Sequence, residues 1–111
     1  MNTLVGIPKT ANPIDLSMVA DFSFGPVLVR PSLRRVDIGN RQEIIEPRVM
    51  QVLIALTRAD GRVLSRDALI ETCWGGRIVG DDTINRCIGK IRQLSELAPG
   101  AFQVETIPRI G

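Results

Sequence analysis

Residues 82–95 read DTINRCIGKIRQLS, and this stretch decides the fold. Its apolar residues recur at the three- and four-residue spacing of one helix face; they are Ile84, Ile88, Ile91 and Leu94. The opposite arc carries one glycine together with polar and basic residues, namely Asn85, Arg86, Gly89, Lys90, Arg92 and Gln93. The pattern predicts a helix that packs on a core with one face and presents the other face outward. Asp81 or Asp82 is expected to cap its N-terminus.

Two further helices are predicted upstream of this stretch. The first has Glu46 at or near its N-cap and ends before Gly61. Its apolar stripe consists of Val49, Val52, Leu53 and Leu56. After a short extended piece at 62–64, Ser65 is expected to cap a second helix, which ends at Trp74.

Short strands are predicted before the helices, over residues 22–24, 27–30, 34–38 and 43–45. They are separated by the turn pairs Gly25-Pro26, Pro31-Ser32 and Gly39-Asn40. This order predicts a small antiparallel meander. Beyond the third helix, residues 102–106 are expected to form a strand and residues 108–111 the turn of a hairpin whose second strand is truncated.

The length and composition are those of one ordinary domain. The chain has 111 residues, of which 44% are hydrophobic and 23% charged, and its formal net charge of +2 does not by itself indicate a nucleic-acid binder. Residues 1–20 are predicted to be a flexible leader and residues 21–111 the folded domain. No apolar run reaches the roughly 18 residues that a membrane helix needs. The domain is therefore expected to be cytoplasmic and to make no membrane contact of its own.

Cofactor binding and enzyme activity are not expected. The chain has no histidine, and Cys73 and Cys87 lack the CxxC spacing of a zinc site, so both are expected to be reduced, half-buried thiols. Without histidine or tyrosine, the usual acid–base groups of enzymes are missing. The glycines at 75, 76 and 80 do not form a GxxxxGK[ST] phosphate loop. We therefore expect no metal, no cofactor and no catalysis.

Several fragments, in this order, are similar to one known family. They are GRVLSRDAL at 61–69, CWG at 73–75, DTI at 82–84 followed by Ile88, Ile91 and Arg92, and ETI at 105–107 with Gly111. Over residues 22–111 the chain resembles the OmpR/PhoB-type winged-helix domains of bacterial transcription regulators. The resemblance implies an α+β winged helix-turn-helix, with an N-terminal four-stranded antiparallel sheet, three helices and a C-terminal β-hairpin wing whose second strand is truncated here.

The position of the domain in the chain resembles one branch of that family. No receiver domain precedes residue 21, which is similar to the CadC/ToxR-like branch, where the DNA-binding domain is N-terminal. This branch implies a longer protein, and a membrane anchor after residue 111 is one form that the continuation takes. Gly89 departs from the family, in which a side chain that contacts DNA is common at this place in the helix.

The outward arc of residues 82–95 carries the chemistry. Between Thr83 and Leu94 every charged residue is basic, whereas a solvated helix face usually mixes signs. In the major groove, Arg and Lys pair with guanine, and Asn and Gln pair with adenine. The predicted base-reading residues are Asn85, Arg86, Lys90 and Gln93. We therefore expect sequence-specific binding of double-stranded DNA by a recognition helix over residues 82–95; the alternative is a winged helix that binds only protein.

Contacts with the DNA backbone are expected from other positions. Arg66 and Thr83 stand in the first turns of the second and third helices, where free amides and the helix dipole favour a phosphate. Trp74 is expected mainly in the core, and the family resemblance implies that its indole N–H points at a phosphate. The residues predicted to contact phosphate or to belong to the wing are Arg66, Trp74, Thr83, Arg92, Thr106 and Arg109. Among these, Arg109 suits a minor groove.

Two protein partners are also expected. In the family, the loop between the second and third helices, here residues 75–80, contacts RNA polymerase or orients the recognition helix, and a simple spacer is an equally weighted alternative. A second copy of the chain is expected beside the first on DNA, because a single helix reads only a few base pairs.

Overall fold

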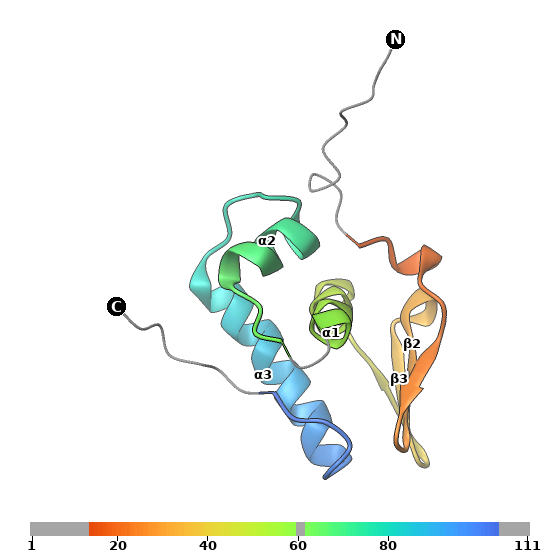
Figure 1. The fold of residues 1–111 in the computed structure, drawn as a ribbon. Coiled ribbons are helices and arrows are strands. Elements are labelled where there is room, and N and C mark those ends of the chain that lie inside the picture. The colour runs from red at the N-terminus through yellow and green to blue at the C-terminus, as the bar shows by residue number, and fades with distance from the viewer. Residues whose placement is uncertain (1–13, 60–61, 105–111) are drawn as a thin grey trace.

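A small sheet and three helices make up the described part of the chain, which in this computed structural model covers residues 14–59 and 62–104. The strands are β1 (Phe22–Phe24), β2 (Val27–Arg30), β3 (Arg35–Ile38) and β4 (Arg41–Ile44), and the helices are α1 (Pro47–Ala59), α2 (Arg66–Trp74) and α3 (Asp81–Leu97). Two short 3-10 turns, η2 (Leu16–Met18) and η3 (Pro31–Leu33), flank the first strands. Figure 1 shows the sheet on one side of the molecule and the helices on the other.

The sheet is the antiparallel meander that the turn pairs predict, in the order β1-β2-β3-β4. Val27 pairs with Ile38 and Val29 pairs with Val36, and all four side chains are buried on the face toward the helices. The predicted bounds of the third and fourth strands shift slightly. β3 begins at 35 because residue 34 has a left-handed backbone, with φ of 53°, and β4 begins at 41 because pairing resumes directly after the two-residue turn at 39–40.

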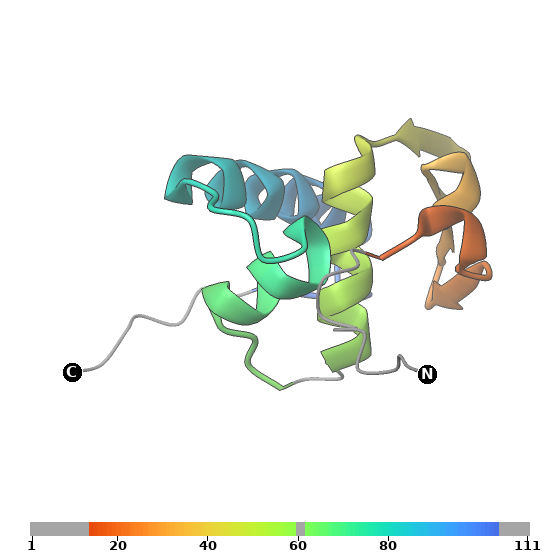
Figure 2. The same ribbon diagram turned by 90° about the horizontal axis from the view of Figure 1, so that it is seen from above.

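Helix α1 lies between the sheet and the other two helices (Figure 2). Its predicted start and end are confirmed, since Pro47 opens it and Ala59 is its last residue. Met50 and Ile54 are completely covered, because α1 is packed on opposite sides by the sheet and by α2 and α3. The domain core is therefore built around α1.

The ends of α2 follow from local sequence. The hydroxyl of Ser65 accepts a hydrogen bond from the backbone N–H of Ala68 at 3.0 Å, which confirms the predicted N-cap. Trp74 is the last residue, and Gly75 follows with φ of 63°, the left-handed conformation that glycine adopts most easily. The extended piece expected at 62–64 forms no strand, because the sheet pairs end with β4 and none of them includes these residues.

Helix α3 differs from its prediction in its cap and in its buried stripe. Gly80, with extended backbone angles, is the N-cap and makes no side-chain cap bond, so the predicted cap at Asp81 or Asp82 is wrong. Both carboxylates instead lie in the first turn, where the positive end of the helix dipole favours them. The buried stripe is Ile84, Cys87, Ile91 and Leu94, and the predicted stripe member Ile88 is only partly buried.

The two cysteines are more deeply placed than expected. Cys73 on α2 and Cys87 on α3 are both completely buried and free, whereas half-buried thiols were predicted. Burial raises the pKa of the Cys73 thiol to about 12, and burial also raises the pKa of the Cys87 thiol. The neutral thiol is a weak nucleophile and a poor metal ligand. Both residues therefore serve packing between α2, α3 and α1.

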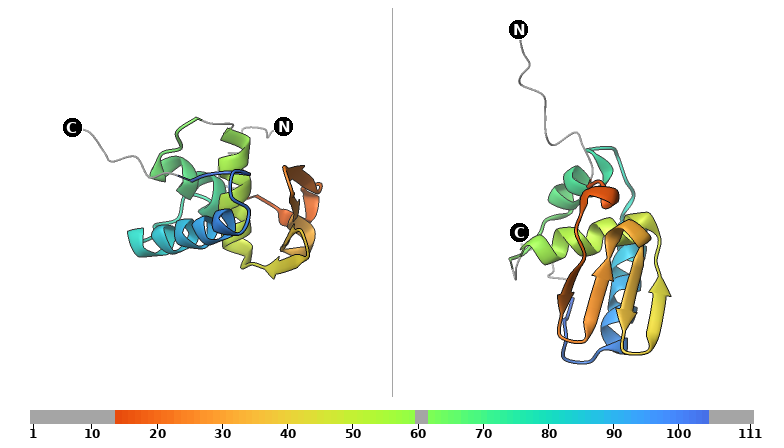
Figure 3. Two further views of the ribbon diagram at one scale, coloured as in Figure 1. Left: turned by 90° about the horizontal axis from the view of Figure 1, so that it is seen from below. Right: turned by 90° about the vertical axis from the view of Figure 1, so that its right-hand side faces the viewer.

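The two ends of the described chain lie against the domain. Residues 14–20 belong to the predicted leader, yet Ile14 donates its N–H to the carbonyl of Thr72 at 3.1 Å and accepts a bond from Nε2 of Gln51 at 2.7 Å. At the other end, residues 102–104 form no strand where residues 102–106 were predicted to be one. Phe102 packs edge-on against Phe24, with ring centroids 5.1 Å apart, so the segment after α3 reaches the β1 end of the sheet (Figure 3).

The rest of the predicted wing, residues 105–111, lies outside the described residues, as do residues 1–13 of the predicted leader. Within the described ranges, no helix combines the length and the apolar character that crossing a membrane requires.

Candidate nucleic-acid interface

The outward face of α3 is exposed along its whole length. Because the buried stripe points at α1, the four predicted base readers on the opposite arc are all exposed: Asn85, Arg86, Lys90 and Gln93. Gly89 lies between them near the centre of this arc, and a Cβ placed there would meet no atom within 4 Å. The first turns of α3 lie at the end of the molecule remote from the sheet, as Figures 2 and 3 both show. We call this surface the outer face of α3.

Arg86 is held on the outer face by an acidic residue from another element. Its Nη1 lies 2.6 Å from Oε1 of Glu46, the residue immediately before α1. About half of each side chain is exposed, at 53% for Arg86 and 55% for Glu46. Sequence reasoning placed Glu46 only near a helix cap, since a partner 40 positions away leaves no local signal.

Arg66 lies on the opposite side of α3 from Glu46 and touches two of its polar residues. Its Nη1 lies 3.3 Å from Oδ1 of Asp81, and its Nη2 donates to Oδ1 of Asn85 at 3.4 Å. The predicted phosphate contact and one predicted base reader are therefore neighbours. Because Asp81 is exposed, this ion pair is weak and an incoming phosphate can replace it.

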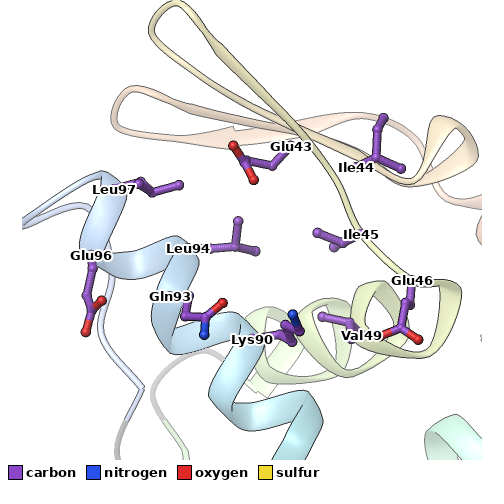
Figure 4. Close-up of a pocket in the computed structure, with 10 residues that line it drawn as sticks. All are labelled: Glu43, Ile44, Ile45, Glu46, Val49, Lys90, Gln93, Leu94, Glu96 and Leu97. Atoms are coloured by element: carbon purple, nitrogen blue, oxygen red, sulfur yellow. The ribbon is translucent and has the colours of Figure 1, made fainter.

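A cavity of about 370 Å³ lies between the C-terminal half of α3 and the junction of β4 with α1 (Figure 4). Lys90 and Gln93 line it together with the carboxylates of Glu43, Glu46 and Glu96. Its apolar lining is Ile44, Ile45, Val49, Leu94 and Leu97. With three acids and one amine, the cavity repels a phosphate, so anion binding on this side depends on the exposed ends of Arg86 and Lys90.

Trp74 is buried, with 7% of its surface accessible, which confirms its predicted place in the core. The guanidinium of Arg48 lies 5.3 Å from the ring centroid and also donates to the backbone carbonyl of Cys73. Arg48 therefore joins the start of α1 to the end of α2, a contact that no local pattern predicts. Whether the indole N–H contacts phosphate remains a prediction.

The remaining predicted contacts lie at the two ends of α3. Thr83 is partly buried in the first turn, and its backbone N–H donates to the carbonyl of Gly80 at 3.2 Å. Near the other end, Nε of Arg92 donates to the carbonyl of Val104 at 3.4 Å, so Arg92 faces the segment that leads to the predicted wing. Thr106 and Arg109 lie outside the described residues. The described residues hold no group of three or more side chains suited to a metal ion.

Comparison with known proteins places this arrangement in a family. Residues 40–111 match the model of the family described as transcriptional regulatory protein, C terminal. The chain belongs to this family. Its structure is similar to that of the DNA-binding domain of Escherichia coli CadC, with a TM-score of 0.67 and 31% identity over 80% of this chain and 85% of that one. The α+β winged-helix fold and the resemblance to the OmpR/PhoB type and its CadC-like branch are thereby confirmed.

The curated relatives are transcription regulators of much greater length. The chain is 35% identical to the transcriptional activator CadC of Escherichia coli K12 over 69 residues, which are 62% of this chain and 14% of CadC. It is 32% identical to the transcriptional regulator HilA of Salmonella typhi over 50 residues, 45% of this chain and 9% of HilA. The chain thus spans a small part of these relatives, and the matched part is shared with regulators rather than enzymes.

Proposed function

We propose that this chain is the DNA-binding domain of a bacterial transcription regulator and that it binds duplex DNA sequence-specifically through the outer face of α3. One observation carries the proposal: four side chains of the types that read base edges are exposed together on one face of a helix, in a fold that matches the DNA-binding domain of CadC. A domain that acts on DNA works in the cytoplasm, whether or not the longer protein carries a membrane anchor.

The roles of the individual residues follow from their chemistry. Arg86 and Lys90 suit guanine O6 and N7, and Asn85 and Gln93 suit adenine N6 and N7. Phosphate contacts are assigned to Arg66, Thr83 and Arg92, with Trp74 supplying its indole N–H and Thr106 and Arg109 the wing. At the start of α3, the carboxylates of Asp81 and Asp82 offset the helix dipole, so Arg66 supplies more of the phosphate attraction there than free amides do.

Salt dependence of duplex binding tests the proposal. If about four to six phosphates are contacted, the logarithm of the binding constant should fall with the logarithm of salt concentration with a slope of roughly −4 to −5. A fluorescence-anisotropy titration at several salt concentrations measures this slope. No binding at low salt, or binding that does not change with salt, would favour the alternative of a winged helix that binds only protein.

Two partners extend the proposal. A second copy on neighbouring half-sites should bind cooperatively when the sites are in phase and lose cooperativity when about five base pairs are inserted, since that rotates one copy to the far side of the duplex. Loop 75–80 is assigned to RNA polymerase, and the complete exposure of Ile78 on this loop supports a protein contact there. A gel-shift series with inserted spacers tests the first, and in vitro transcription with Ile78→Ser tests the second.

A further inference from the structure

The base-reading candidate Arg86 does not extend freely into solvent, because Glu46 holds one of its nitrogens at 2.6 Å. We propose that Glu46 is a positioning residue for DNA recognition, which fixes Arg86 for base reading and lowers binding to non-preferred DNA. This inference rests on the proposed DNA binding and adds a determinant of specificity that lies outside α3.

Both residues of the pair stand on rigid backbone. The carbonyl of Glu46 accepts the backbone N–H of Met50 at 3.0 Å, and Met50 is completely buried. Arg86 precedes the completely buried Cys87 on α3. The positions of the two Cα atoms are thus set by the core, and the ion pair settles only the orientation of the side chains.

The contact leaves Arg86 with hydrogen-bonding capacity. A guanidinium has five N–H donors in a planar fork, and the bond to Glu46 uses Nη1. The other donors remain for a base edge, which requires two of them in one plane to pair with guanine. A side chain that is already tethered loses less conformational freedom when it binds, so the pair favours the correctly matched site.

The carboxylate of Glu46 has a second effect with the same sign. It places a negative charge beside the outer face of α3, where a non-specific complex depends on phosphate attraction. On the preferred site, base contacts by Arg86 compensate for this repulsion, whereas on other sequences nothing does. Both effects raise the ratio of the affinity for the preferred duplex to that for a scrambled duplex.

The test compares Glu46→Gln with Glu43→Gln. Glu43 lines the same cavity, but it pairs with Arg41, at 3.5 Å, so its substitution removes an equal charge without touching Arg86. The probes are the duplex selected by the wild-type chain from a random pool and a scrambled duplex of equal length. Because exposed ion pairs are weak, the affinity ratio should fall about two- to fivefold in Glu46→Gln and stay unchanged in Glu43→Gln. Thermal melting of both variants checks that they fold.

A double variant shows whether Glu46 acts through Arg86. In the Arg86→Ala background, Glu46→Gln should leave the affinity ratio unchanged, because the side chain to be positioned is absent. An unchanged or higher ratio in the single variant Glu46→Gln would overturn the proposal, and so would an equal fall in Glu43→Gln. If the wild-type chain itself binds neither duplex at low salt, the proposed function fails and takes the role of Glu46 with it.

Discussion

The two faces of α3 differ in how much of their environment comes from nearby sequence. The inner face, made of Ile84, Cys87, Ile91 and Leu94, packs on α1 in a way that helical periodicity anticipates. The outer face meets partners from distant parts of the chain, such as Glu46 beside Arg86 and Arg66 beside Asn85. Burial can therefore be inferred from spacing along one helix, whereas charge pairing depends on how helices are arranged in space.

This difference changes the electrostatic picture of the outer face. Between Thr83 and Leu94 the sequence contains no acid, which suggests an unopposed cationic surface. In the structure, Glu46 pairs with Arg86 and Asp81 pairs with Arg66, so part of this positive charge is compensated before any ligand arrives. Discrimination among DNA sequences then depends on geometry as well as on charge.

The largest expected effect is on the inner face. Ile91→Ala should lower the free energy of unfolding by about 2 to 5 kcal/mol, because Ile91 is completely buried and its removal leaves a cavity. Ile78→Ala is the matched control, since the same atoms are removed from a fully exposed side chain, and it should change stability by less than about 0.5 kcal/mol. Urea unfolding measures both, and equal losses would contradict the assignment of the inner face.

The buried thiols make the stability of the same region depend on pH. The pKa of Cys73 is about 12 in the folded chain against an ordinary value of 9.0, so the unfolded chain releases this proton at lower pH. Stability should be fully present below about pH 9 and should fall from there toward pH 12, by up to about 1.4 kcal/mol per pH unit. Urea unfolding from about pH 8 to pH 10 should show a shallower loss in Cys73→Ala. Parallel curves for the two proteins would show that the thiol does not titrate in this way.

A smaller effect is expected at Gly89 on the outer face. Gly89→Ala should stabilise the domain by about 0.5 to 1 kcal/mol, because alanine favours a helix interior and its methyl group meets no neighbouring atom. Affinity for DNA should change little, since the longer side chains around this position keep the backbone away from base edges. Thermal melting and a DNA titration check the two parts. A loss of affinity of about tenfold or more would mean that the backbone at Gly89 approaches the DNA closely.

Much of the fold could be predicted because its signals are local. Ser65 caps α2 with its own hydroxyl, and the tight turn at 39–40 dictates where β4 begins to pair. The cap of α3 could not be settled this way, because the choice of Gly80 over Asp81 depends on the path of the preceding loop. Periodicity also allows either Cys87 or Ile88 in the buried stripe, and the position of α1 decides for Cys87.

The candidate site was predictable in composition but not in its contacts. Side-chain type and helical spacing place Asn85, Arg86, Lys90 and Gln93 on one exposed face, as the structure shows. The contacts of Arg48 with Trp74 and of Glu46 with Arg86 join residues 26 and 40 positions apart, and only the packing of α1 against α2 and α3 creates them. The DNA-contacting role of each residue stays a prediction.

Selection of bound sequences from a random pool of duplex DNA tests the central claim most directly, because it shows whether the outer face of α3 reads bases. The wild-type chain should enrich one motif. Arg86→Ala should enrich the same motif with the base preference lost at one position, and its affinity for the wild-type site should be weaker by about 1 to 3 kcal/mol. Because Arg86 is exposed, its unfolding free energy should change little. The account would be contradicted if the wild-type chain enriched no motif, or if Arg86→Ala enriched an unchanged one.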